Sequence, residues 1–125
     1  MVNEQRTYPE IRHYQIVNSK LDEIAKYINK PLTKLVNHSN IKDTYPMVDH
    51  IDVYELEDIN YLILRIYVND PEMDEDNMYD KELDPHYLVD YHFRKFLPYI
   101  GMEPNKRTGF AVVRPDGQVI SKWMN

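Results

Sequence analysis

The sequence contains no cysteine, which excludes disulfide bonds, thiolate nucleophiles, iron–sulfur clusters and cysteine-ligated zinc sites. It has three glycines, Gly101, Gly109 and Gly117, and none belongs to a G-x-G-x-x-G or Walker loop, in which the backbone approaches a phosphate. No serine lies in a G-x-S-x-G sequence. The usual signatures of dinucleotide, nucleoside triphosphate and serine-hydrolase chemistry are therefore missing.

Long apolar runs are missing as well, so we expect no membrane-spanning helix. The stretch from Met1 to Thr7 is polar, and we expect no signal peptide there. A fold without cysteine needs no oxidising compartment, and we therefore expect a cytoplasmic location.

The composition is that of an ordinary globular protein. The chain has 125 residues, of which 42% are hydrophobic and 29% are charged. A chain of this length buries about two thirds of its surface on folding, which is enough for a core without disulfides or metals. We expect one domain over residues 1–125.

Negative charge is concentrated between Asn69 and Asp84, a stretch that we call the acidic segment. It holds eight acidic residues and one base, Lys81, for a net charge of −7; because the whole chain carries −6, the other 109 residues sum to +1. Such a segment fits a solvated loop, a docking surface for a basic partner, or a cation site. An EF-hand is excluded because Glu75 and Lys81 stand where its calcium loop needs a glycine and a bidentate glutamate.

The N-terminal third shows apolar residues at helical spacing. Thr7 to Glu10 fits a capping box, and the apolar pattern continues beyond it. We expect a long helix over residues 7–38 that is kinked at Pro31, or two helices that meet near Asn29. A short strand over residues 13–17, followed by a helix, is the alternative.

Strand patterns occupy the middle and the end of the chain. Residues 48–56 and 60–68 alternate with a period of two, and the second stretch is apolar on one face and partly apolar on the other. We therefore expect this second strand to be central in the sheet, with Arg65 as a snorkelling residue or an interface anchor. Residues 109–114 and 118–123 predict two further strands joined by a tight turn.

A second helix is expected between the two pairs of strands. Asp84 is its N-cap and Pro85 its first residue, and Pro98 should end or kink it before Gly101. Its predicted buried stripe consists of Leu88, Val89, His92, Phe93, Phe96 and Leu97. The order α-β-β-α-β-β predicts a single α+β domain, an antiparallel sheet with the long N-terminal helix and the second helix packed on one face.

Histidines and acids form two candidate clusters. On the second helix, His86 lies one turn from Asp90, whereas His92 lies on the apolar stripe, where we expect a core histidine with one satisfied nitrogen. On the first strand, His50 and Asp52 share a face; they are outward polar residues or, if that face meets the acidic segment, part of a metal site. We expect no catalytic residue, no metal ligand and no cofactor.

Tyrosine is abundant, with 11 residues against three phenylalanines. Tyr79, Tyr87, Tyr91 and Tyr99 cluster around the acidic segment and the second helix, and Tyr87 lies one helical turn from Tyr91. Tyrosine combines a large contact area with a polar group and is common at interfaces, although it also replaces phenylalanine in small cores.

These features predict a small non-enzymatic protein-binding module of the inhibitor, immunity or adaptor type, which docks on a basic protein surface. The expected partner-binding residues are Asp70, Glu72, Asp74, Glu75, Asp76, Tyr79, Asp80, Tyr87 and Tyr91. Basic residues on one face are too few to predict nucleic-acid binding.

Two other functions stay open. The long N-terminal helix, with Asn18 at a heptad core position, would suit a homo-oligomer and hence a structural subunit of a virion-type or other assembly. A divalent-metal hydrolase would use His50, Asp52, His86 and part of the acidic segment. Frequent Asn, Ile, Lys and Tyr with few glycines fit an AT-rich genome, as in phages and low-GC bacteria.

Overall fold

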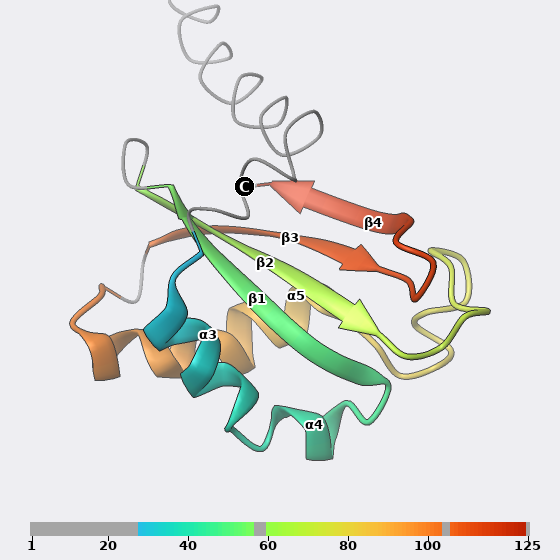
Figure 1. Cartoon of the computed structure of the whole chain (residues 1–125), viewed down its shortest axis with the longest axis horizontal. Helices are drawn as coiled ribbons and strands as arrows, with labels where there is room; N and C mark the ends of the chain where they lie inside the picture. Colours follow the sequence, from blue (N-terminus) through green and yellow to red (C-terminus); the bar gives the residue numbers. More distant parts are fainter. Residues whose placement is uncertain (1–27, 57–59, 104–105, 125) are drawn as a thin grey trace, which may run out of the picture.

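The computed structural model describes residues 28–56, 60–103 and 106–124. They form a small α+β fold, in which a four-stranded mixed sheet carries a few short helices (Figure 1). In chain order the elements are α3 (Lys30–Asn37), α4 (Ile41–Thr44), β1 (Val48–Leu56), β2 (Tyr61–Val68), α5 (Pro85–Tyr87), η3 (Leu88–His92), η4 (Phe93–Ile100), β3 (Arg107–Val113) and β4 (Val119–Met124).

The predicted long helix over residues 7–38 is not matched by the described part of the chain. Residues before Ile28 lie outside it, as do the capping box, the alternative strand and the heptad asparagine. The first described helix, α3, begins at Lys30, and the Asn29 side chain caps it by accepting a backbone N–H of the first turn at 3.1 Å. Pro31 therefore lies in the first turn, where its missing N–H leaves no bond unmade, and it does not kink the helix.

The sheet has the order β1-β2-β3-β4, so the central position predicted for the second strand is confirmed. The prediction of an antiparallel sheet is wrong, because β2 and β3 run parallel while the two outer pairings are antiparallel. The cause is the connection over residues 69–106, whose helical stretch returns the chain to the end of the sheet where β2 begins. Alternation within a strand carries no information about this direction.

The helices lie on one face of the sheet (Figure 1). One apolar core joins Leu32 of α3, Phe93 of the later helical stretch, Leu64 of β2 and Phe110 of β3, and all four side chains are buried. Burial continues on both faces of β2 over residues 61–64, as expected for a central strand.

The second helix begins as predicted. The Asp84 carboxylate accepts the N–H of Tyr87 at 3.2 Å, and Pro85 occupies the first position. After one α-helical turn the backbone widens, so that the N–H of Phe93 donates to the carbonyl of Leu88, five residues back.

The same helical stretch then tightens and continues to Ile100. Pro98 lies inside these tight turns and does not end them; the stretch ends at Gly101, whose φ of 77° is the left-handed conformation that favours glycine. Of the predicted stripe, Leu88, Val89, Phe93 and Leu97 are buried, and His92 and Phe96 lie at its margin.

The acidic segment lies at the end of the sheet where β2 and β3 end, near the turn of the β3–β4 hairpin (Figure 1). That turn agrees with the prediction: Gly117 has a φ of 88° and its N–H donates to the Arg114 carbonyl at 2.8 Å. Residues 76–83 of the acidic segment form a series of hydrogen-bonded turns.

Candidate functional site

The acidic segment has a defined conformation because three of its apolar side chains are anchored in the core. Met73, Met78 and Leu83 are all at most 1% exposed and belong to the same core as the sheet. These residues lie five positions apart in the sequence, so they attach the backbone of the segment to the core at three points. The polar residues between these points are therefore held on the surface.

Hydrogen bonds within the segment fix its first half. The N–H of Asp74 donates to the Asn77 side chain, and the N–H of Asn77 donates to the Asp74 carboxylate, both at 2.9 Å. The Asn77 amide also donates to the carbonyl of Glu72 at 2.9 Å. Side chains that bond the local backbone in this way stabilise turns without a helix.

One carboxylate of the segment, that of Asp70, forms an ion pair, whereas the exposed carboxylates form none with the described residues. Lys81 donates to Asp70 at 2.7 Å, and this bond, with one from the N–H of Glu72, lowers the pKa of Asp70. Lys81 is the single base of the segment. Six acids face solvent, namely Glu72, Asp74, Glu75, Asp76, Asp80 and Glu82.

Arg114 borders the segment from the β3–β4 turn. Its guanidinium donates to Asp116 at 2.8 Å and to Gln118 at 2.7 Å, and reaches the carbonyl of Met73 at 3.5 Å. The Asp116 hydrogen bond raises the pKa of Arg114, and the charges of Asp74 and Glu72 add to the effect. Because Arg114 is already paired with Asp116, it does not neutralise the acids of the segment, and the surface stays negatively charged.

Tyr87 and Tyr91 form a stacked pair directly after the acidic segment. Their ring centroids are 4.9 Å apart with an interplanar angle of 14°, and the two residues are 51% and 47% exposed. Asp84 links the segment to the pair through its bond to the Tyr87 N–H. The Lys95 ammonium lies 4.1 Å from the centre of the Tyr91 ring, at cation–π distance.

The pair is supported by His92, whose imidazole packs edge to face against three rings. Its centroid lies 5.4 Å from Tyr87, 5.0 Å from Tyr91 and 5.4 Å from Tyr45, which is buried. Burial lowers the pKa of His92, and Lys95 lowers it further. His92 is thus a partly buried histidine that supports aromatic rings. We predicted that one of its ring nitrogens would be hydrogen-bonded, whereas the contacts that the structure describes are to aromatic rings.

The structure joins some of the predicted residues and not others. Tyr79 is 52% exposed, and within the described residues no ring contact connects it to Tyr87 or Tyr91. Tyr45 was not predicted as a core residue, and it follows the short helix α4 as a buried residue. The four-residue spacing of Ile41 and Tyr45, both buried, was the available signal.

The two histidine clusters do not assemble into one site. His50 stacks on Tyr67 with centroids 4.2 Å apart, on the face of the sheet opposite the helices. His86 lies on the helical side and packs at 4.9 Å against both Phe110 and Trp123. Across residues 28–56, 60–103 and 106–124, no three His, Asp or Glu side chains gather in a way that could hold a metal ion.

The predicted contact of His86 with Asp90 is also absent from the described contacts. The His86 imidazole packs against Phe110 and Trp123 instead. Packing of an aromatic ring contributes more to stability than an exposed ion pair does. Asp90 pairs with Arg94 one turn ahead, at 3.6 Å.

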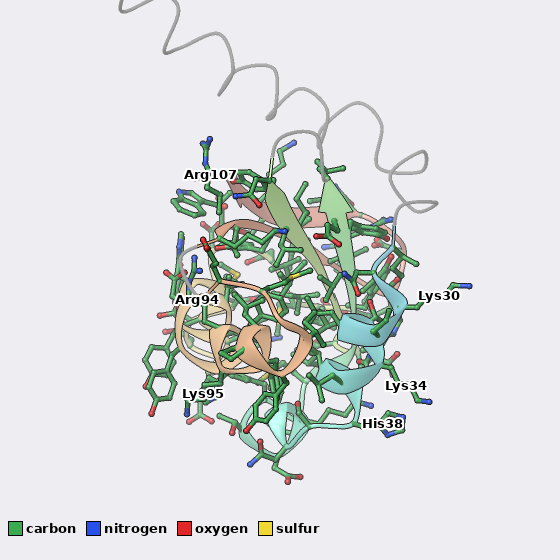
Figure 2. The ribbon with its side chains drawn as sticks, turned by 90° about the vertical axis from the view of Figure 1, so that its left-hand side faces the viewer. Lys30, Lys34, His38, Arg94, Lys95 and Arg107 are labelled. Atoms are coloured by element: carbon green, nitrogen blue, oxygen red, sulfur yellow. The ribbon has the colours of Figure 1, made fainter. Side chains whose placement is uncertain are left out.

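Basic side chains point into solvent on different sides of the molecule. Figure 2 shows Lys30 and Lys34 on one side, and Arg94 with Lys95 on the other. Arg94 is also occupied, since it donates to the carbonyl of Lys106 at 2.9 Å and to the Thr108 hydroxyl at 2.8 Å. These cations therefore do not form one surface for a polyanion.

In the described part of the chain, no helix has the length and apolar character needed to cross a bilayer. Comparison with protein-family models, curated proteins and solved structures finds no match for this chain.

Proposed function

We propose that this protein is a small non-enzymatic binding module, of the inhibitor, immunity or adaptor type, which docks on a basic protein partner. The docking surface consists of the acidic segment and the stacked pair Tyr87–Tyr91. On the absence of cysteine we also propose that it acts in the cytoplasm.

The observation that carries the proposal is the fixed conformation of a segment with many unpaired charges. Met73, Met78 and Leu83 anchor it, and the reciprocal bonds of Asp74 and Asn77 hold its turns. A surface that is ordered before it binds loses little conformational entropy on association. A merely solubilising loop needs no such order, so the anchoring favours recognition.

Charge and aromatic surface have different roles in this proposal. The exposed carboxylates attract a basic partner and increase the association rate. Tyr87 and Tyr91 provide contact area at short range, and His92 holds their rings in place.

The experiment starts from immobilised full-length protein and the proteins that it retains from a cell extract. Binding of each purified retained protein is then measured with wild type and with Glu75→Gln/Asp76→Asn. The matched control, Asp43→Asn/Glu103→Gln, removes the same charge from exposed acids outside the segment. We expect at least a tenfold loss of affinity for the first variant, steeper salt dependence for wild type, and little change for the control.

The aromatic half of the surface has its own matched pair. Tyr87→Ala/Tyr91→Ala removes the stack, whereas Tyr99→Ala removes a tyrosine that is 79% exposed and lies elsewhere on the helical stretch. We expect the double variant alone to dissociate faster. Equal binding by wild type, the charge variant and the tyrosine variant would reject the proposal.

A further inference from the structure

The face of the sheet opposite the helices is partly accessible at one end. His50 and Asp52 of β1, with Arg65 and Tyr67 of β2, are all partly exposed there. We call these four residues the sheet-face patch. Further along the same face, Tyr54 and Ile63 are buried.

Arg65 makes no hydrogen bond or ion pair within the patch. Its Nε is buried and has no hydrogen-bond partner, and its guanidinium lies 5.2 Å from the centre of the Tyr67 ring. A guanidinium offers five N–H donors in a fixed fork that matches a carboxylate, and a buried donor without an acceptor is unfavourable. The Nε itself is shielded from solvent, so an acceptor from outside the fold would bind the rest of the guanidinium, since Arg65 is only partly buried.

Asp52 is a candidate acceptor on the neighbouring strand, yet it does not pair with Arg65. The two residues lie directly opposite each other in the β1–β2 register, where cross-strand side chains are neighbours. No ion pair or hydrogen bond joins them in the described part of the chain, although other surface pairs such as Lys81–Asp70 close to 2.7 Å. A cation and an anion thus lie side by side without combining.

We propose that a second copy of this chain docks on the sheet-face patch across a two-fold axis, with Arg65 of each copy bound to Asp52 of the other. In a two-fold interface residue i meets residue j and j meets i, so adjacent opposite charges are self-complementary. A uniformly acidic or basic partner would meet a like charge in this patch. Tyr67, stacked on His50, supplies the flat surface beside the ion pairs.

This interface is separate from the surface in the proposed function and does not depend on it. The acidic segment is left out of the contact, and the charge of −6 on each copy makes the pairing stronger at moderate than at very low ionic strength.

The test reverses one charge at a time and then mixes the variants. Wild type should show twice 15.1 kDa by light scattering. Asp52→Arg gives a patch with two cations and Arg65→Asp a patch with two anions, so each alone repels its own copy, and we expect at least a tenfold weaker dimer. An equimolar mixture restores both pairs, and native mass spectrometry should find a dimer with one copy of each. Asp43→Arg, an exposed reversal outside the patch, should dimerise as wild type does.

Any of four results would overturn the inference. Wild type that stays at 15.1 kDa at high concentration rules out the dimer without reference to any variant. Dimers that persist in both reversed variants place the interface elsewhere. Folded variants whose mixture stays monomeric show that Arg65 and Asp52 do not meet across the interface. If a reversal prevents folding, Asp52→Asn and Arg65→Gln remove the charges with less disturbance, and unchanged dimerisation in both contradicts the inference.

Discussion

The side-chain amide of Asn37 pairs with the backbone of Ile51 as a neighbouring strand would. Its Nδ2 donates to the Ile51 carbonyl at 2.8 Å, and its Oδ1 accepts the Ile51 N–H at 2.9 Å. One turn earlier in α3, the Thr33 hydroxyl accepts the N–H of Val53 at 2.9 Å. Helix α3 therefore satisfies outer backbone groups of Ile51 and Val53 in β1, which is one of the two edge strands of the described sheet. Covering an edge in this way prevents uncontrolled strand pairing.

Replacing Asn37 should therefore destabilise the fold. Asn37→Ala leaves a backbone N–H and a carbonyl of Ile51 without partners, and we expect the free energy of unfolding to fall by about 1–3 kcal/mol. Urea unfolding measures the change. Asn40→Ala is the control, since Asn40 is exposed and its side chain makes no capping bond, and it should stay within about 0.5 kcal/mol of wild type. Equal stability of both variants would contradict the importance of this pairing.

Gly109 is required for close packing between β3, β4 and the Tyr61 ring. A Cβ at this position would lie 2.7 Å from the Trp123 carbonyl oxygen and 3.2 Å from the Tyr61 ring. The carbonyl belongs to the backbone and cannot rotate away, so Gly109→Ala should destabilise the protein by about 1–3 kcal/mol. Trp123 is the single tryptophan and reports unfolding by fluorescence.

The control for Gly109 is Gly117→Asn in the β3–β4 turn. Gly117 has open space around it and a positive φ that asparagine tolerates better than most residues. We expect a change below about 1 kcal/mol. A Gly109→Ala protein as stable as wild type would show that the strands separate without penalty.

The local parts of the fold were predictable from the sequence because their causes are local. Alternation predicted the bounds of β1 and β2 to within a residue, and Asp84 with Pro85 predicted a helix start. That Tyr87 and Tyr91 are neighbours followed from helical spacing in the same way, whereas the stacking of their rings was not predicted.

The remaining features depend on contacts between distant parts of the chain. The parallel pairing of β2 with β3 is decided by how residues 69–106 cross the sheet, which no short pattern encodes. The contact of His92 with Tyr45 and the bond of Asn37 to Ile51 also need the folded arrangement. Polar residues in these positions resemble surface residues when the sequence is considered alone.

The N-cap of the second helix links the acidic segment to the tyrosine pair. Asp84→Ala removes the acceptor of the Tyr87 N–H, and we expect a loss of about 1 kcal/mol in the free energy of unfolding. Asp80→Ala removes an exposed acid of the same segment and should leave stability within about 0.5 kcal/mol. Amide exchange of the first helical turn should accelerate in the Asp84 variant alone. Equal exchange in the two variants would mean that Pro85 suffices to start the helix.

His92 should make the protein less stable in mild acid. Burial, with Lys95, lowers its pKa below the unfolded value of about 6.5, so the unfolded chain takes up a proton more readily than the folded one. The contribution of the neutral imidazole to stability is complete above that value. It is lost as the pH falls below about 6.5, until the folded pKa is reached. The titratable side chains that face His92 are three tyrosines and Lys95.

The measurement compares unfolding free energies near pH 7 and near pH 5 for wild type, His92→Gln and His38→Gln. Wild type and His38→Gln should both lose stability on acidification, since the His38 side chain that the variant replaces is exposed in wild type. His92→Gln should be less stable near pH 7, because it lacks the ring that supports Tyr87 and Tyr91, but should lose less on acidification. Identical pH dependence in all three proteins would assign the acid sensitivity to other groups. An NMR titration of His92 with a midpoint above about 6.5 would reverse the expected sign.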